Sequence, residues 1–176
     1  MSQDEAQQRE LLATACHILY KLGLSDYLGH PSVRLDPERV LIKPKHSPRI
    51  RGMDRTGPAD MVVIDLDGRL TAGEHEPPSE RFIHTEIYRA RPDVVSVVHT
   101  HQPISTLLGV VELPILPLLH VDSMILDEQP VPIYHNAELV VTPTAGQRLA
   151  EALGTSLTTW YTNMSTKVAS WAAKAT

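Results

Sequence analysis

Two histidines separated by one residue end an apolar run of the sequence. His99 and His101 follow the segment 94–98, Val-Val-Ser-Val-Val, whose composition predicts a buried strand. Because residues i and i+2 of a strand point to the same face, the two imidazoles would project side by side. Paired imidazoles are natural ligands for a borderline divalent metal such as zinc. The alternative is a pair of hydrogen-bonded histidines at a strand end, and the spacing alone favours it.

A carboxylate lies nineteen residues upstream of His99. Glu80 follows Pro77, Pro78 and Ser79 at the start of an expected helix, for which Ser79 is the predicted N-cap. Exposed amide groups and the helix dipole favour a negative charge at such a place. Near a metal, Glu80 could bind the ion or move protons between carbon and solvent. Its alternative role is helix capping.

The elements that would position these groups mix helices with short strands in one domain. Helices are expected at residues 4–22, 80–90, 103–108 and 143–153, and strands at 32–35, 40–42, 61–65, 69–71, 94–101, 113–119 and 131–134. The pairs Asp36-Pro37 and Asp67-Gly68 mark turns, and no Gly-rich dinucleotide fingerprint is present. The expected fold class is therefore a mixed α/β domain with antiparallel hairpins.

Composition excludes several classes of function. The 176 residues are 42% hydrophobic and 21% charged, with a net charge of −5 and interspersed signs. This balance argues against nucleic-acid and membrane-surface partners. The sequence has no apolar run long enough to span a membrane and begins with a polar, acidic segment, so a cytoplasmic location is expected. Cys16, in an apolar helical pattern, is expected to be a small core residue.

Residues 155–176 differ from the rest of the chain. They contain no Asp, Glu, Arg, His, Pro or Gly, and they hold both tryptophans of the sequence. Apolar residues recur at mainly three- and four-residue steps, which predicts a helix and would leave neighbouring strands with an open edge. The segment is either a Ser/Thr-rich amphipathic end helix or the product of a changed reading frame or truncation near residue 155.

Several segments together resemble the class II aldolase/adducin family. The resemblance rests on Pro77-Pro-Ser-Glu80, His84, Arg91-Pro-Asp-Val94, Val98-His-Thr-His101, Val131-Pro-Ile-Tyr134 and Ala145–Gly154, and it covers roughly residues 8–154. It implies a three-layer fold with a central, mostly antiparallel sheet flanked by helices. It further implies a domain over 1–154 that is incomplete at its C-terminal end, an atypical tail over 155–176, and a cyclic homotetramer.

The same resemblance assigns roles to individual residues. His99 and His101 match metal ligands, with zinc as the expected ion and manganese as the alternative. Glu80 matches the catalytic acid/base. Gly29 and Ser79 match positions that line the anion-binding part of the pocket for a small-molecule substrate. His84 is expected to pack near the site without a catalytic role.

The sequence departs from the family pattern at three places. His30 stands where the sugar-phosphate aldolases carry Asn, and Lys43-Pro44 stands where they carry Thr-Gly. An imidazole and a lysine can bind a carboxylate or a phenolic oxygen, so His30 and Lys43 are expected to bind substrate. The alternative is that both are loop residues without a functional role. Third, the tail lacks the further metal-binding His of the pattern, and His120 is the first candidate to replace it.

These features predict a divalent-metal-dependent carbon–carbon lyase. It would perform aldol cleavage or decarboxylation of a small hydroxy-carbonyl or hydroxy-carboxylate substrate, as in the family branch that decarboxylates hydroxylated aromatic or heteroaromatic acids. The alternatives are a sugar-phosphate epimerase of the same family and a non-catalytic, truncated family member.

Overall fold

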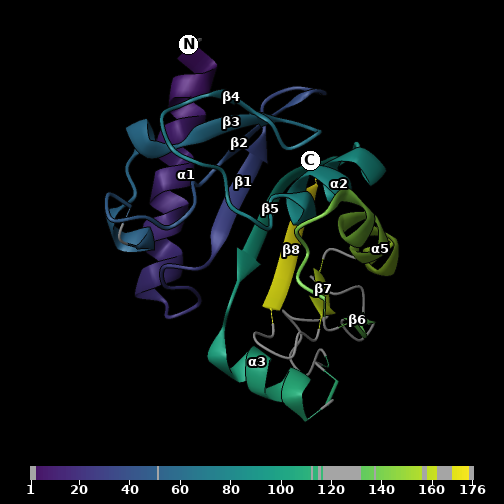
Figure 1. Ribbon diagram of the computed structural model, residues 1–176. Coiled ribbons are helices and arrows are strands. Elements are labelled where there is room, and N and C mark those ends of the chain that lie inside the picture. The colour runs from purple at the N-terminus through teal and green to yellow at the C-terminus, as the bar shows by residue number, and fades with distance from the viewer. Residues whose placement is uncertain are drawn as a thin grey trace.

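The computed structural model describes residues 3–50, 52–111, 113–114, 116, 132–136, 138–155, 158–161 and 168–174. The strands join in one sheet of order β4-β3-β2-β1-β5-β8-β7-β6 (Figure 1). They are β1 (His30–Arg34), β2 (Arg39–Ile42), β3 (Val62–Asp65), β4 (Leu70–Ala72), β5 (Val94–Thr100), β6 (Ile133–Tyr134), β7 (Thr158–Tyr161) and β8 (Val168–Lys174). The helices are α1 (Gln3–Lys21), α2 (Phe82–Ala90), α3 (Pro103–Val110) and α5 (Pro143–Leu153), with short 3-10 turns η1 (Met53–Arg55) and η2 (Pro58–Asp60).

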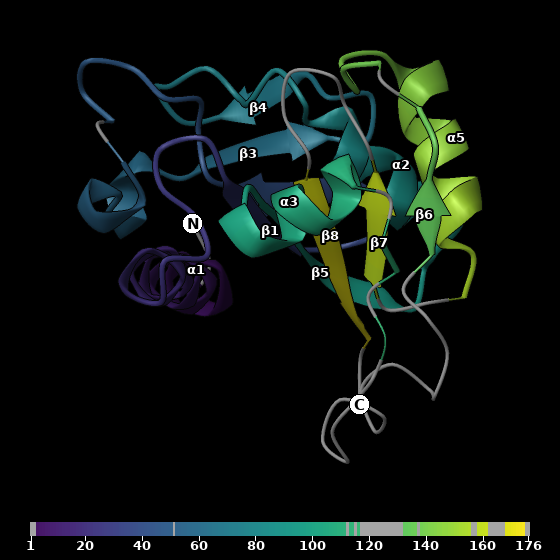
Figure 2. The same ribbon diagram turned by 90° about the horizontal axis from the view of Figure 1, so that it is seen from below.

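Helices cover both faces of the sheet, because alternate strand residues are apolar on each side. Leu41 and Val63 pack with Cys16 of α1, which is fully buried as predicted. Their neighbours Val40 and Ile64 pack on the opposite face, against α2 and α5. Figure 2 shows α1 on one side of the sheet and α2 with α5 on the other. The predicted fold, a mostly antiparallel sheet flanked by helices, is confirmed.

Strand β5 lies at the centre of the sheet between β1 and β8. Both neighbours run antiparallel to it, and among the strand pairs that the structure describes only β6 and β7 are parallel. The register places His99 opposite His30 of β1 and opposite Ser170 of β8. Directly opposed residues point to the same face of a sheet, so this register collects groups from distant parts of the sequence around His99.

Most of the predicted elements are confirmed within one or two residues. The helix of residues 143–153 has the predicted bounds and ends at Gly154, where φ is +55°. The capping role predicted for Ser79 is wrong, since α2 begins at Phe82 with Arg81 as its N-cap. A backbone turn from Arg81 N–H to the Pro78 carbonyl occupies the predicted first turn. The predicted strand 113–119 falls largely outside the described residues.

The helix predicted within residues 155–176 is also wrong, because residues 158–161 and 168–174 form strands β7 and β8. Strand β8 takes the edge of β5 that β1 leaves unpaired, so the predicted open edge of β5 is absent. Backbone groups at a central strand need partners on both edges, and this requirement outweighs the helical spacing. The run Thr158-Thr-Trp-Tyr161 also consists of residue types that favour strands. In the part of the chain that the structure describes, no helix is long and apolar enough to cross a membrane.

Candidate metal and substrate site

His99 and His101 share one face of the sheet where β5 ends, as the spacing predicts. Their Nε2 atoms lie 3.1 Å apart, and the two rings meet edge to face. Two nitrogen ligands of a tetrahedral zinc ion, each about 2.1 Å from it, lie about 3.4 Å from one another. The separation of the two imidazoles is therefore suited to a shared cation.

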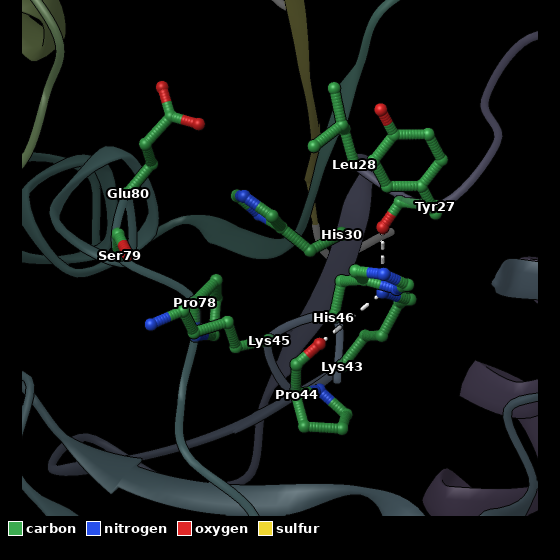
Figure 3. Close-up of a pocket in the computed structure, with 10 residues that line it drawn as sticks. All are labelled: Tyr27, Leu28, His30, Lys43, Pro44, Lys45, His46, Pro78, Ser79 and Glu80. Atoms are coloured by element: carbon green, nitrogen blue, oxygen red, sulfur yellow. Dashed lines mark hydrogen bonds between the residues drawn. The ribbon is translucent and has the colours of Figure 1, made fainter. Parts of the chain in front are cut away.

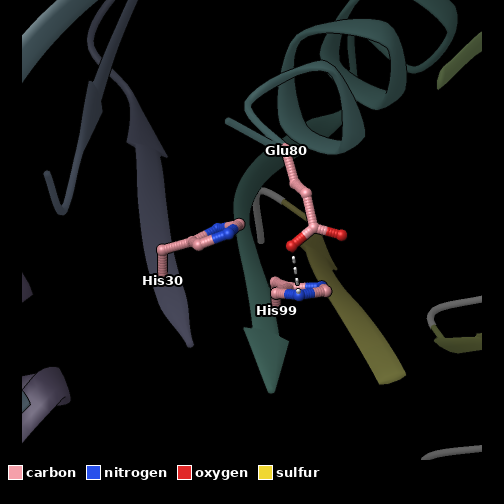
Figure 4. Close-up of side chains that lie close together, drawn as sticks. All are labelled: His30, Glu80 and His99. Atoms are coloured by element: carbon pink, nitrogen blue, oxygen red, sulfur yellow. Dashed lines mark ion pairs between the residues drawn. The ribbon is translucent and has the colours of Figure 1, made fainter. Parts of the chain in front are cut away.

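Glu80 approaches the same point from the turn before α2. Its Oε2 atom lies 3.7 Å from Nε2 of the fully buried His99 (Figure 4). His30, Glu80 and His99 form a group whose ligand atoms all lie within 4.8 Å of one another. Imidazole and carboxylate donors in this arrangement fit a divalent cation such as zinc or manganese.

His30 reaches this group through strand pairing. It lies opposite His99 in the β1–β5 ladder, and the two rings stack with centroids 4.5 Å apart and planes 18° apart. The ring points from β1 toward Glu80 (Figure 4).

A cavity of about 260 Å³ opens beside His30 and Glu80. Figure 3 shows His30 between Ser79 and Glu80 on one side and Lys43 and His46 on the other, with the Lys45 side chain below Ser79. The polar and aromatic lining consists of Tyr27, His30, Lys43, Lys45, His46, Ser79 and Glu80. The lining holds two lysines and one carboxylate, and Glu76 pairs with Lys45 at 3.3 Å, so an anionic ligand would meet Lys43 and would compete with Glu76 for Lys45.

The predicted substrate-binding residues are brought together only in part. His30, Lys43 and Ser79 line the cavity, whereas Gly29 is absent from its lining. Lys43 is almost fully buried, and its Nζ donates to the carbonyls of Tyr27 and Pro44. Burial lowers the pKa of the Lys43 ammonium. Lys45 and His46 also line the cavity and were not predicted, although the basic run Lys43-Pro-Lys-His46 was a visible signal.

Gly29 has a steric role next to the site. A Cβ atom at this position would lie 1.8 Å from Ser25 Oγ and 2.9 Å from the His99 carbonyl oxygen. We expect Gly29→Ala to lower the free energy of unfolding by about 1–3 kcal/mol, because forced overpacking costs this much. Urea unfolding measures the change. Gly57→Ala is the control, because its Cβ would meet only an Asp60 oxygen at 3.5 Å. Equal midpoints for the two variants would contradict the steric role.

The histidines of the site are held in the neutral form. Burial, the neighbouring histidines and Lys43 keep the pKa of His30 well below its ordinary value. Burial, with charge repulsion from His101 and His84, does the same to the pKa of His99. Burial also lowers the pKa of His101, against the opposing effect of Asp26. Neutral imidazoles are the form that binds metals and that forms directional hydrogen bonds.

His84 packs beside the site, as the resemblance implied, and it also contacts His30 directly. It is fully buried on α2, and its Nε2 lies 2.7 Å from Nδ1 of His30. Its other nitrogen, Nδ1, lies 2.7 Å from Ser32 Oγ. Two histidines 54 residues apart gave no sequence signal of contact, because only the pairing of β1 with β5 and the packing of α2 bring them together.

Burial of His84 makes stability depend on acidity. Burial lowers the pKa of His84 to about 3, from an ordinary value near 6.5. Between these values the unfolded chain binds a proton that the folded chain does not, so stability is lost as the pH falls below about 6.5. The loss is about 1.4 kcal/mol per pH unit for each such histidine. Urea titrations from pH 7 to 5 should show a shallower pH dependence for His84→Gln than for the wild type, and identical slopes would contradict the assignment.

Comparison with known proteins agrees with this fold. Residues 10–165 match the family described as Class II Aldolase and Adducin N-terminal domain. A 3,4-dihydroxyphthalate decarboxylase of Terrabacter sp. is 36% identical over 162 residues, which are 88% of this chain and 67% of that protein. A methylthioribulose-1-phosphate dehydratase of Pectobacterium atrosepticum is 31% identical over 157 residues, which are 84% of this chain and 74% of that protein.

The structure of an L-fuculose 1-phosphate aldolase superposes with a TM-score of 0.79 at 22% identity, covering 100% of this chain and 78% of that one. The chain spans 63–67% of the length of the 3,4-dihydroxyphthalate decarboxylases that it matches. Since the family model covers most of the sequence and the fold agrees with it, the chain belongs to the class II aldolase and adducin N-terminal domain family.

Proposed function

We propose that the chain is a divalent-metal-dependent carbon–carbon lyase that decarboxylates a small hydroxylated aromatic acid. The observation that carries this proposal is that His99 lies beside both His101 and Glu80, and that Glu80 itself lines a cavity that also holds Lys43 and Lys45. His99 and His101 would hold the ion, zinc in the first place and manganese as the alternative, with Glu80 beside it. When bound, such an ion withdraws electrons from substrate oxygens and stabilises the negative charge that develops as the bond breaks.

Glu80 moves the proton in this proposal. As a carboxylate it accepts the proton of the substrate hydroxyl next to the departing carboxyl group. The carbon–carbon bond then breaks, carbon dioxide leaves, and the electron pair stays on the ring carbon. Glu80 returns its proton to that carbon, so hydrogen replaces the carboxyl group and Glu80 is again ionised. The product is left as a phenolate, which takes a proton from water. The same residue could serve aldol cleavage, in which an aldehyde leaves in place of carbon dioxide.

Size and charge support an aromatic acid as the substrate. An apolar cavity of about 150 Å³ holds benzene, so a cavity of about 260 Å³ accommodates one substituted ring. Tyr27 and His46, with ring centroids 5.0 Å apart, offer flat surfaces at its wall. The half-exposed ammonium group of Lys45 pairs with exposed Glu76 at 3.3 Å, and a carboxylate that the reaction leaves in place could replace Glu76 as its partner. The 3,4-dihydroxyphthalate named for the relatives is a molecule of this kind.

Turnover by this chain is expected to be slow. The family pattern has a third metal-binding histidine downstream of α5, and the sequence has none in residues 155–176. His120, the first candidate to replace it, lies outside the described residues. Two imidazole ligands bind a divalent ion more weakly than three, so a smaller fraction of the protein would be loaded.

A substrate panel tests the proposed function. Protein loaded with zinc or manganese is incubated separately with 3,4-dihydroxyphthalate, methylthioribulose 1-phosphate and L-fuculose 1-phosphate. We expect metal-dependent release of carbon dioxide from the aromatic acid above a protein-free blank, with little conversion of either sugar phosphate. Faster conversion of a sugar phosphate than of the aromatic acid would reject the decarboxylase proposal in favour of dehydration or aldol cleavage.

A further inference from the structure

A chain of four buried polar side chains leads from the core to the candidate site. Tyr88 Oη lies 2.8 Å from Ser32 Oγ, which lies 2.7 Å from Nδ1 of His84. Nε2 of His84 lies 2.7 Å from Nδ1 of His30. All four residues are buried, and no part of the proposed reaction uses His84, Ser32 or Tyr88.

The spacing of residues on β1 and on α2 brings these four side chains together. His30 and Ser32 are two residues apart on β1 and share a face of the sheet, while His84 and Tyr88 are four residues apart on α2 and share a face of the helix. Each element thus supplies two of the four members. A buried polar group without a partner costs about 1–3 kcal/mol, so every member depends on its neighbours in the chain.

In this row of four hydrogen-bonded side chains, the donor and acceptor roles at one end determine the roles at the other end, because the imidazoles are neutral. Each ring has one N–H donor and one bare nitrogen, so His84 either donates to His30 and accepts from Ser32, or the reverse. In the first direction His84 Nε2–H donates to His30 Nδ1, and His30 must carry its own hydrogen on Nε2. In the reverse direction His30 Nε2 is bare.

The hydroxyl groups at the far end favour the first direction. A phenol is more acidic than an alcohol, so Tyr88 is the better donor and Ser32 the better acceptor in their shared contact. The Ser32 hydrogen then has two acceptors within reach, His84 Nδ1 at 2.7 Å and the Val97 carbonyl at 3.5 Å. The shorter contact is the stronger hydrogen bond, so Ser32 donates to His84 Nδ1. His84 Nε2–H then donates to His30 Nδ1.

We propose that His84 is a positioning residue that fixes His30 as a neutral Nε2–H donor directed at an anionic oxygen of the substrate. His30 lines the cavity, and its ring points toward Glu80 (Figures 3 and 4). Stacking on His99 holds the plane of the ring, and the bond to His84 sets which nitrogen carries the hydrogen. The role as a donor to substrate rests on the proposed function, whereas the tautomer of His30 does not.

Nitrogen-15 NMR of histidine-labelled, metal-free protein tests the tautomer directly. Two-bond proton–nitrogen correlations distinguish an Nε2–H ring from an Nδ1–H ring. We expect Nε2–H on both His30 and His84 in the wild type. An Nδ1–H tautomer of His30 would overturn the proposal, because the bare Nε2 would then make His30 a metal ligand. His17, which bonds to the Thr56 carbonyl beside α1, serves as the internal reference.

Variants separate positioning from simple packing. His84→Gln keeps an amide N–H that can donate to His30 and should preserve the Nε2–H tautomer. His84→Leu removes that donor and should leave His30 as a mixture of tautomers. Ser32→Ala is the milder variant if His84→Leu fails to fold, and it should give a mixture at His84 and at His30. An unchanged His30 tautomer in the folded Leu or Ala variant would overturn the positioning role.

Titration with benzoate, a plain aromatic carboxylate, tests the donor role without turnover. We expect benzoate to shift the His30 Nε2–H resonance in the wild type and in His84→Gln. The dissociation constant should rise about tenfold in the Leu or Ala variant, which is the loss of one good hydrogen bond. Benzoate binding without a shift at His30 would overturn the donor role. Absence of decarboxylation in the substrate panel would leave the tautomer result standing and reject only the proposed reaction.

Discussion

Glu80→Gln is expected to lower turnover by roughly two to four powers of ten, the usual contribution of a positioned acid/base group. The amide has nearly the shape of the carboxylate but cannot accept the hydroxyl proton or return a proton to carbon. His99 and His101, which supply the two imidazole ligands, are unchanged, so metal binding should largely survive. Steady-state carbon dioxide release at saturating metal and substrate measures the effect.

The matched control for Glu80→Gln is Glu10→Gln, which neutralises an exposed carboxylate on α1. This variant should turn over at the wild-type rate, because its side chain is not among the residues that line the cavity. Near-normal turnover by Glu80→Gln with stoichiometric metal would remove Glu80 from the mechanism.

Ser170→His is expected to raise the affinity for zinc by roughly ten- to a hundredfold, which corresponds to one added imidazole ligand. Residue 170 lies directly opposite His99 in the β5–β8 ladder. Cross-strand partners in a regular antiparallel ladder have Cβ atoms about 5 Å apart, and the predicted gain rests on this register. Zinc titration against a competing chromophoric chelator measures the dissociation constant.

Ala169→His is the control for this gain. Residue 169 pairs with Thr100, one position along the ladder from the pair of His99 with residue 170, and strand faces alternate with each position. Its affinity for zinc should stay at the wild-type level. Equal gains for the two variants would mean that the register of β8 does not position the ligand.

Local patterns were sufficient to predict much of the fold and part of the site. The valine-rich segment 94–98 predicted β5, and the Asp67-Gly68 turn predicted the β3–β4 hairpin. Both predictions were correct because strand propensity and turn chemistry act over a few residues. The shared face of His99 and His101 followed from strand periodicity alone. The tail was mispredicted because the need of β5 for a second partner is a tertiary effect that the spacing of apolar residues does not contain.

Contacts between distant segments could not be predicted from those patterns. The stacking of His30 on His99 depends on the register between β1 and β5, and the contact of His30 with His84 depends on how α2 packs on that face. His84 was interpreted as a packing residue, since a single histidine in a helix has no periodic signal that distinguishes packing from positioning. Gly29 was predicted to line the pocket. In the structure Ser25 and the His99 carbonyl leave no space for a Cβ atom at this position, which explains why the residue is a glycine.

Calorimetric titration of the metal-free protein with zinc tests the central claim most directly, because every proposed step depends on an ion held by His99 and His101. The account predicts one zinc ion per folded wild-type chain and a loss of affinity of at least about tenfold in both His99→Ala and His101→Ala. Zinc binding that is absent from the folded wild type, or that is equally strong in the two alanine variants, would contradict it.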